Sequence, residues 1–214
     1  MKTTFFITTT IMLCMTLFTP AHAQTVRDAQ YEEFMQQALR RLDSAATVEE
    51  LQQTGNLFER ISKKYSLEWM PAYYVAYCNV NSVFYDAKSS RNEMFLTKAG
   101  EIIDALYSYP DAAQSEINTL KAYCLTAMIT TNPEVNGQKY FSEVIRLYEK
   151  AIAQDTENPR PVILLTDFER QLPPFVRPDK RNPDEEKAKA AVLFEKEAPN
   201  IEKPYWGKFF LKRE

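Results

Sequence analysis

The sequence predicts an all-α protein: a short right-handed stack of helix-turn-helix repeats with about three pairs of helices plus terminal helices. First, the 214 residues include only 4 glycines, far below the usual share of about 7%. Second, apolar and charged residues recur at the spacing of an amphipathic helix over most of the chain. Third, Ala-Tyr-Cys occurs at 76–78 and again at 122–124, which indicates an internal repeat.

The first element is expected to be a cleavable export signal over residues 1–23. It holds one lysine, an apolar run over 7–18 and a small-residue ending at Ala21-His22-Ala23, the pattern of a secretory signal. The apolar run is shorter than the roughly 20 residues that a spanning helix needs. We therefore expect a periplasmic or secreted protein with no membrane span after cleavage.

Cleavage would remove His22, which is the only histidine of the chain. A mature chain without histidine cannot use Ser-His-Asp or Cys-His catalysis, or a zinc site that needs imidazole. The formal net charge is −3, and no basic tract is dense enough to neutralise a line of phosphates. The sequence therefore predicts no catalytic residues, no metal, no cofactor and no nucleic-acid partner.

Helices are expected over most of the remaining chain. An N-terminal helix lies within 24–46, and two starts carry capping patterns, Thr47 with Glu50 and Ser90 with Glu93. The expected helices span 25–44, 47–65, 69–87, 91–109, 112–131, 138–155, 160–171 and 184–198.

Three of these helices contain stretches that align at an offset of 45 residues. The stretches begin at Leu51, Leu96 and Phe141, and apolar and acidic residues occupy matching columns. Any two amphipathic helices share part of this agreement, but not a regular offset or a recurring partner helix. A partner helix with Ala-Tyr-Cys follows the first two stretches, and "PRPVILLTDFERQL" follows the third. Because one helical hairpin cannot bury its apolar face alone, such units are expected to stack.

The stretch "YEKAIAQDTENPRP", residues 148–161, resembles the end of a tetratricopeptide repeat. The usual period of that repeat is about 34 residues, whereas this chain repeats at 45 to 46. The excess falls in "YDAKSSRNE" and "TTNPEVNGQK". Residues 47–172 are therefore tetratricopeptide-like, with HEAT-type pairs as the alternative. The whole chain resembles small secreted tetratricopeptide-like proteins of Gram-negative bacteria, which implies a fold and export but no activity.

Two cysteines of the mature chain, Cys78 and Cys124, lie at matching positions of the repeat. Packed helix axes are about 8–10 Å apart, whereas the α-carbons of a disulfide lie within about 7 Å. We favour two buried thiols, and a disulfide remains the alternative.

Candidate binding residues lie on the tyrosine-rich helix within 69–87. Tyr73, Tyr77 and Asn81 share one face at spacings of four, and the offset of 46 carries this face to Thr119 and Tyr123. If the face lines the concave side of the stack, the tyrosines are partly exposed and form an aromatic groove. The alternative is that they pack in the core.

The C-terminal part begins with a proline-rich connection over 173–183, followed by a helix and an aromatic tail over 184–214. Asp184, Glu185 and Glu186 are expected in the first turn of that helix, where carboxylates favour the helix dipole. The tail gathers four aromatic residues that either dock onto the body or bind a partner: Tyr205, Trp206, Phe209 and Phe210.

Together these features predict an exported, non-catalytic helical-repeat protein that serves as a protein- or peptide-binding scaffold in the cell envelope. A structural subunit of an envelope assembly is the alternative, and a histidine-free hydrolase is a further one. The sequence contains no glycine-rich phosphate loop, nucleophile motif or spaced pair of acids that would favour an enzyme.

Overall fold

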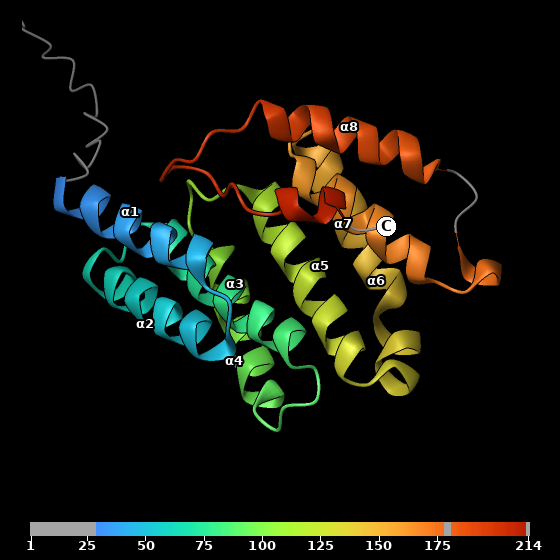
Figure 1. Cartoon of the computed structure of the whole chain (residues 1–214), viewed down its shortest axis with the longest axis horizontal. Coiled ribbons are helices and arrows are strands. Elements are labelled where there is room, and N and C mark those ends of the chain that lie inside the picture. Colours follow the sequence, from blue (N-terminus) through green and yellow to red (C-terminus); the bar gives the residue numbers. More distant parts are fainter. Residues whose placement is uncertain (1–28, 178–180, 213–214) are drawn as a thin grey trace, which may run out of the picture.

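The computed structural model describes residues 29–177 and 181–212. Within these ranges the chain forms eight α-helices and two short 3-10 helices, with no strand, so the predicted all-α fold is confirmed (Figure 1). The expected signal over residues 1–23 lies outside them. The helices are α1 (Ala29–Ser44), α2 (Val48–Lys64), α3 (Trp69–Tyr85), α4 (Asn92–Leu106), α5 (Gln114–Thr131), α6 (Pro133–Gln154), α7 (Pro159–Gln171), η1 (Pro174–Val176), α8 (Pro183–Glu195) and η2 (Lys208–Lys212).

The helices pack in the order of the sequence, each against the next. Helix α3 also contacts α5, and α5 contacts α7. We call α3, α5 and α7 the inner helices, and α2, α4 and α6 the outer helices. The tetratricopeptide assignment and the proposed domain boundaries stay predictions.

One of the two expected helix starts is confirmed and the other is wrong. Thr47 and Glu50 form a complete capping box at the start of α2, in which the Glu50 backbone N–H donates to Thr47 Oγ1 over 3.1 Å. At the start of α4 the N-cap is Arg91, which has no side-chain cap. The Arg91 N–H instead donates to Ser89 Oγ over 3.3 Å, so the preceding turn is organised around Ser89 and not Ser90.

Helix α6 begins five residues before its expected start at position 138, because Asn132 and Pro133 form a better starting signal. The Asn132 side chain accepts a hydrogen bond from the Val135 N–H over 3.3 Å. Pro133 occupies the first turn, where a missing N–H costs nothing. Much of the insertion within 130–139 is therefore helical, and only the segment after α3 remains a loop.

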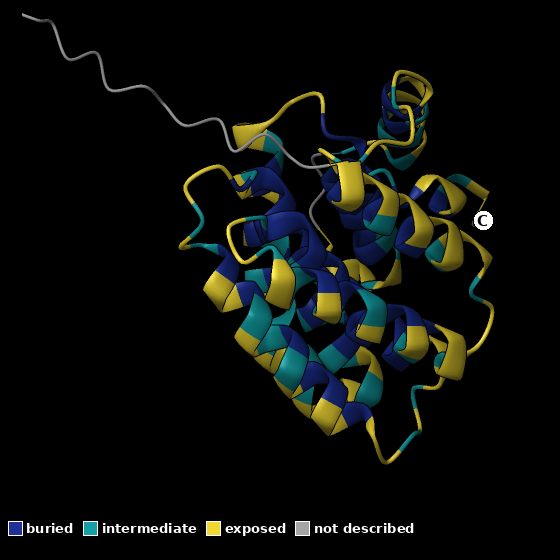
Figure 2. Ribbon diagram, turned by 90° about the vertical axis from the view of Figure 1, so that its left-hand side faces the viewer, coloured by how far each residue is buried: buried dark blue, intermediate teal, exposed yellow. Residues whose placement is uncertain are grey.

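The inner helices supply much of the core, and buried residues gather in the interior of the molecule (Figure 2). Of the 17 residues of α3, 14 are buried, whereas only 4 of the 22 residues of α6 are buried. Buried amides on α3 donate to backbone carbonyls one turn earlier: Asn79 to Val75 and Asn81 to Tyr77, over 2.8 and 2.9 Å. This local pairing lets polar side chains lie in the core without an unpaired donor.

Cys78 and Cys124 are both free and buried, so the preference for two thiols is confirmed. Helices α2 and α3 approach closely at Gly55 of α2. A Cβ at this position would lie only 3.3 Å from the Cβ of Cys78 on α3. At Gly100, which aligns with Gly55 at the offset of 45 residues, a Cβ would meet nothing within 4 Å.

Within the described ranges, none of the helices has the length and apolar character needed to cross a bilayer.

Candidate functional site

The C-terminal segment, residues 196–212, turns back from α8 and packs against the inner helices (Figure 1). Trp206 lies between two tyrosines, with its ring centroid 4.5 Å from Tyr77 and 5.4 Å from Tyr123. Phe210 meets the Tyr123 ring edge-on at 6.0 Å. Trp206 and Phe210 are both buried, so the aromatic tail docks onto the body of the protein.

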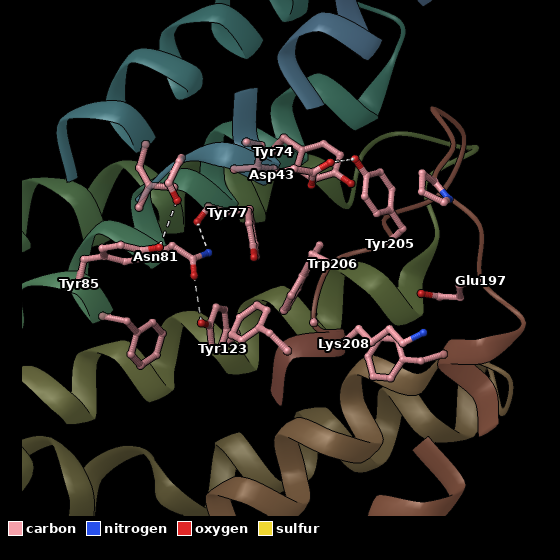
Figure 3. A pocket seen from close by; sticks show the side chains of 18 residues that line it. Asp43, Tyr74, Tyr77, Asn81, Tyr85, Tyr123, Glu197, Tyr205, Trp206 and Lys208 are labelled. Atoms are coloured by element: carbon pink, nitrogen blue, oxygen red, sulfur yellow. Dashed lines mark hydrogen bonds between the residues drawn. The ribbon is translucent and has the colours of Figure 1, made fainter. Parts of the chain in front are cut away.

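A cleft of about 730 Å³ lies between the C-terminal segment, α1, α3 and α5 (Figure 3). Half of its lining consists of aromatic side chains, which come from α3, α5, α8 and the C-terminal segment. These are Tyr74, Tyr77, Phe84, Tyr85, Tyr123, Phe194, Tyr205, Trp206 and Phe209.

Hydrogen bonds hold the cleft walls in place (Figure 3). The Tyr123 hydroxyl donates to Asn81 Oδ1 over 3.2 Å, which joins α5 to α3. The Tyr205 hydroxyl donates to Asp43 Oδ2 over 3.1 Å, which joins the C-terminal segment to α1. Burial, with a smaller contribution from Tyr123, raises the pKa of Tyr77 well above its usual value. The Tyr77 phenol therefore stays protonated at neutral pH.

The charges around the cleft are of two kinds. Asp43 accepts from Tyr205, and Glu197 pairs with Arg160, so both lining carboxylates are engaged. Lys208 is exposed, and it is the one cation among the described residues that line the cleft. A negatively charged group entering the cleft would therefore meet Lys208.

Three of the five candidate binding residues line this cleft: Tyr77, Asn81 and Tyr123. Tyr73 and Thr119 lie deeper and are fully buried. The expectation of partly exposed tyrosines is wrong, because Tyr77 is 5% exposed and Tyr123 is 3% exposed beneath the C-terminal segment. Whether these residues bind a ligand stays a prediction.

An ion network lies next to the cleft and was not expected from the sequence. The Arg160 guanidinium is buried and contacts Glu116 Oε1 at 2.6 Å and Glu197 Oε1 at 2.8 Å. Burial lowers the pKa of Arg160, but the two carboxylates outweigh this effect and raise it overall. Burial raises the pKa of Glu197, and its bonds to Arg160 oppose this rise. A lone arginine between two prolines gives no sequence signal for such a network.

The acidic cluster of α8 has the position predicted for it, because Asp184, Glu185 and Glu186 occupy the first turn of the helix. Across residues 29–177 and 181–212, histidine, cysteine and acidic side chains form no group of three or more that could hold a metal ion.

Comparisons with known proteins give one structural match. The chain is similar to the HusA haemophore from Porphyromonas gingivalis, with a TM-score of 0.75 and 24% sequence identity. The match covers 86% of this chain and 90% of the HusA chain. No protein-family model and no curated protein matches the sequence. At this identity the likeness concerns the fold, and it agrees with the all-helical architecture described above.

Proposed function

We propose that the protein is an exported, non-catalytic binding protein that holds a flat tetrapyrrole ring in the aromatic cleft. The cleft itself carries the proposal. Its volume of about 730 Å³ lies within the range of about 300–1,000 Å³ common for small-molecule sites. Its aromatic lining suits a flat, largely apolar ring. A protein of similar fold is described as a haemophore, which supports a tetrapyrrole among flat ligands.

The lining predicts how the ring would be held. Aromatic side chains attract a flat π-system by stacking or by edge-to-face contact. The exposed aromatic side chains at the cleft are those of Tyr85, which is 52% exposed, and Phe209, which is 47% exposed. Lys208 would receive a carboxylate substituent of the ring. The phenol of Tyr77 stays protonated and is a poor ligand for ferric iron. We therefore expect ring contacts, rather than an iron bond, to dominate the affinity.

The same residues support a role without catalysis. The lining carboxylates, Asp43 and Glu197, are both occupied by protein partners. The lining phenol of Tyr77 has a pKa far above the range of a general base near neutral pH. Export is supported by the signal-like segment 1–23.

Titration of the mature chain, residues 24–214, tests the proposal. Iron protoporphyrin IX and metal-free protoporphyrin IX should both give saturable changes in porphyrin absorbance and quench tryptophan fluorescence. Phe209→Ala should weaken binding by about tenfold, because one exposed ring contact is lost. Phe175→Ala is the matched control: Phe175 is 87% exposed and lies outside the cleft, so binding should not change.

Two results would count against this proposal. One is the absence of saturable binding for either porphyrin at micromolar concentrations. The other is equal weakening by Phe209→Ala and Phe175→Ala, which would indicate nonspecific adsorption to exposed aromatic side chains.

A peptide ligand is the second candidate, in line with the scaffold role predicted from the sequence. One observation favours it: the cleft region already accommodates an extended segment of this chain, whose Trp206 packs between Tyr77 and Tyr123. A panel of aromatic-rich synthetic peptides, tested by fluorescence anisotropy against the intact mature chain, examines this function. Binding that is saturable and weakened by Phe209→Ala would favour a peptide ligand, and no binding by any peptide would argue against it.

A further inference from the structure

Arg160 uses its whole guanidinium group in one buried cluster. Its Nε and Nη2 donate to Glu116, with the shortest distance 2.6 Å. Its Nη1 and Nη2 donate to Glu197 over 2.8 Å each. Nη1 also lies 3.4 Å from the carbonyl oxygen of Trp206. Such complete satisfaction is what a buried arginine needs to offset the loss of water.

The same cluster also holds the side chain of Trp206. The indole Nε1 donates to the Tyr73 hydroxyl over 2.9 Å, and that hydroxyl donates to Glu116 Oε2 over 3.2 Å. The backbone and the ring of Trp206 are therefore both connected to the Arg160–Glu116 pair. Arg160 lies on α7 and Glu116 on α5, so two inner helices position one residue of the C-terminal segment.

Backbone geometry fixes the next residue of the segment. Gly207 has a φ of +105°, a conformation that favours glycine. A Cβ at this position would lie 3.2 Å from Arg160 Cγ and 3.3 Å from Phe194 Cζ. Any other residue at position 207 would therefore strain the backbone and crowd Arg160 and Phe194.

We propose that Arg160 is the positioning residue of the cleft: through Glu116 and Glu197 it fixes the C-terminal segment as a preformed wall of the ligand site. This inference rests on the proposed function and adds how the site is held ready. Glu197 links the network to the ligand, because it pairs with Arg160 and also lines the cleft. A preformed wall increases affinity, since the segment loses no further conformational freedom on binding.

The test uses the mature chain with Trp69→Phe, which leaves Trp206 as the sole tryptophan of the 2 in the sequence. Glu197→Gln removes one charge of the network and keeps the shape of the side chain. Glu157→Gln is the matched control, because Glu157 forms an exposed ion pair with Lys196 over 3.0 Å. Acrylamide quenching of Trp206 without ligand, porphyrin affinity and the induced circular dichroism of bound porphyrin are measured for each protein.

Glu197→Gln should raise the quenching constant of Trp206 at least twofold, weaken protoporphyrin binding by about tenfold and change the induced circular dichroism. Glu157→Gln should leave all three unchanged. Gly207→Ala displaces the wall without changing any charge, and it should reproduce the effects of Glu197→Gln. A purely structural role of the network would change thermal stability but not the circular dichroism of the bound porphyrin.

Unchanged quenching in both Glu197→Gln and Gly207→Ala would overturn the proposal, because the network would not hold the wall. Increased quenching with unchanged affinity would also overturn it, because the wall would not belong to the ligand site. A reference protein that binds no porphyrin would refute the proposed function, and quenching would then decide by itself whether Arg160 fixes the segment.

Discussion

The inner and outer helices of this stack differ sharply in burial. Helix α3 has 14 of its 17 residues buried, and α7 has 10 of 13. The outer helices α2 and α6 have 5 of 17 and 4 of 22 buried. The outer helices pack mainly against the two helices next to them in the sequence, whereas the inner helices also contact one another and the C-terminal segment. The C-terminal segment therefore buries a surface of the inner helices that would otherwise be exposed.

This difference has a consequence for function. A binding surface on the inner helices is accessible only where the C-terminal segment leaves a gap, and the cleft is such a gap. Tyr77 and Tyr123 are buried in the core and also line the cleft. If the proposed function holds, substitutions at these positions will change stability as well as binding. Exposed lining residues such as Phe209 and Tyr85 are better positions for separating the two effects.

The largest loss of stability is expected from substitutions on the inner helices. The double substitution of Tyr77 and Tyr123 by alanine should cost about 3–5 kcal/mol per site in free energy of unfolding, less than additively because both rings contact Trp206. Chemical denaturation followed by circular dichroism measures the loss. Met94→Ala on α4, where the side chain is 58% exposed, is the outer-helix control and should change little. A double variant as stable as the original would show that these rings are not core.

The second-largest loss of stability is expected from removing part of the C-terminal segment. Truncation after residue 204 removes Trp206 and Phe210, which are buried. We expect a loss of about 3 kcal/mol, since burial of each ring contributes about 1.5–3 kcal/mol before the cost of ordering the segment. Truncation after residue 211 keeps both rings and serves as the control. Equal melting temperatures for the two truncated proteins would contradict the role of the segment as a cover for the inner helices.

A third test uses the thiols of the inner helices. Burial raises the pKa of Cys124 to about 12 and that of Cys78 above its usual value. At pH 8, four units below that pKa, roughly one Cys124 in ten thousand is a thiolate. The native protein should therefore react very slowly with an aromatic disulfide reagent. In the unfolded mature chain, both cysteine thiols should react promptly. Rapid reaction of the native protein would show that the inner helices open readily.

The smallest loss of stability is expected from breaking an ion pair between two outer helices. Lys98 on α4 pairs with Glu59 on α2 over 2.6 Å, and this hydrogen bond, with a smaller one from Lys63, lowers the pKa of Glu59. A lowered folded-state pKa gives stability that is present above the unfolded pKa of about 4.3 and is lost as the pH falls through the folded value. Because the pair is partly exposed, Lys98→Gln should cost at most about 0.5 kcal/mol at pH 7.

The pH dependence provides the check on that last expectation. Unfolding measured at pH 7 and pH 3 should show the difference between Lys98→Gln and the original protein shrinking at the lower pH, as Glu59 becomes protonated. A difference of the same size at both pH values would mean that packing of the lysine stem, and not its charge, supports the contact.

The sequence by itself determined the helices, because helical periodicity and end signals are local. The capping box at Thr47 and Glu50 is confirmed, and the errors at Ser90 and at the start of α6 arose where neighbouring signals competed. The preference for two free, buried thiols is also confirmed, because it rested on the general spacing of packed helices compared with the reach of a disulfide.

Which residues come together to form the cleft was determined only by the tertiary structure. The α3 residues Tyr77 and Asn81 were found from periodicity, but Trp206 and Lys208 enter the site from more than 120 residues away. The path of the C-terminal segment depends on Arg160, whose partners Glu116 and Glu197 lie 44 and 37 residues away in sequence. Buried ion pairs form only when the fold removes water from all partners at once, so no local pattern marks them in advance.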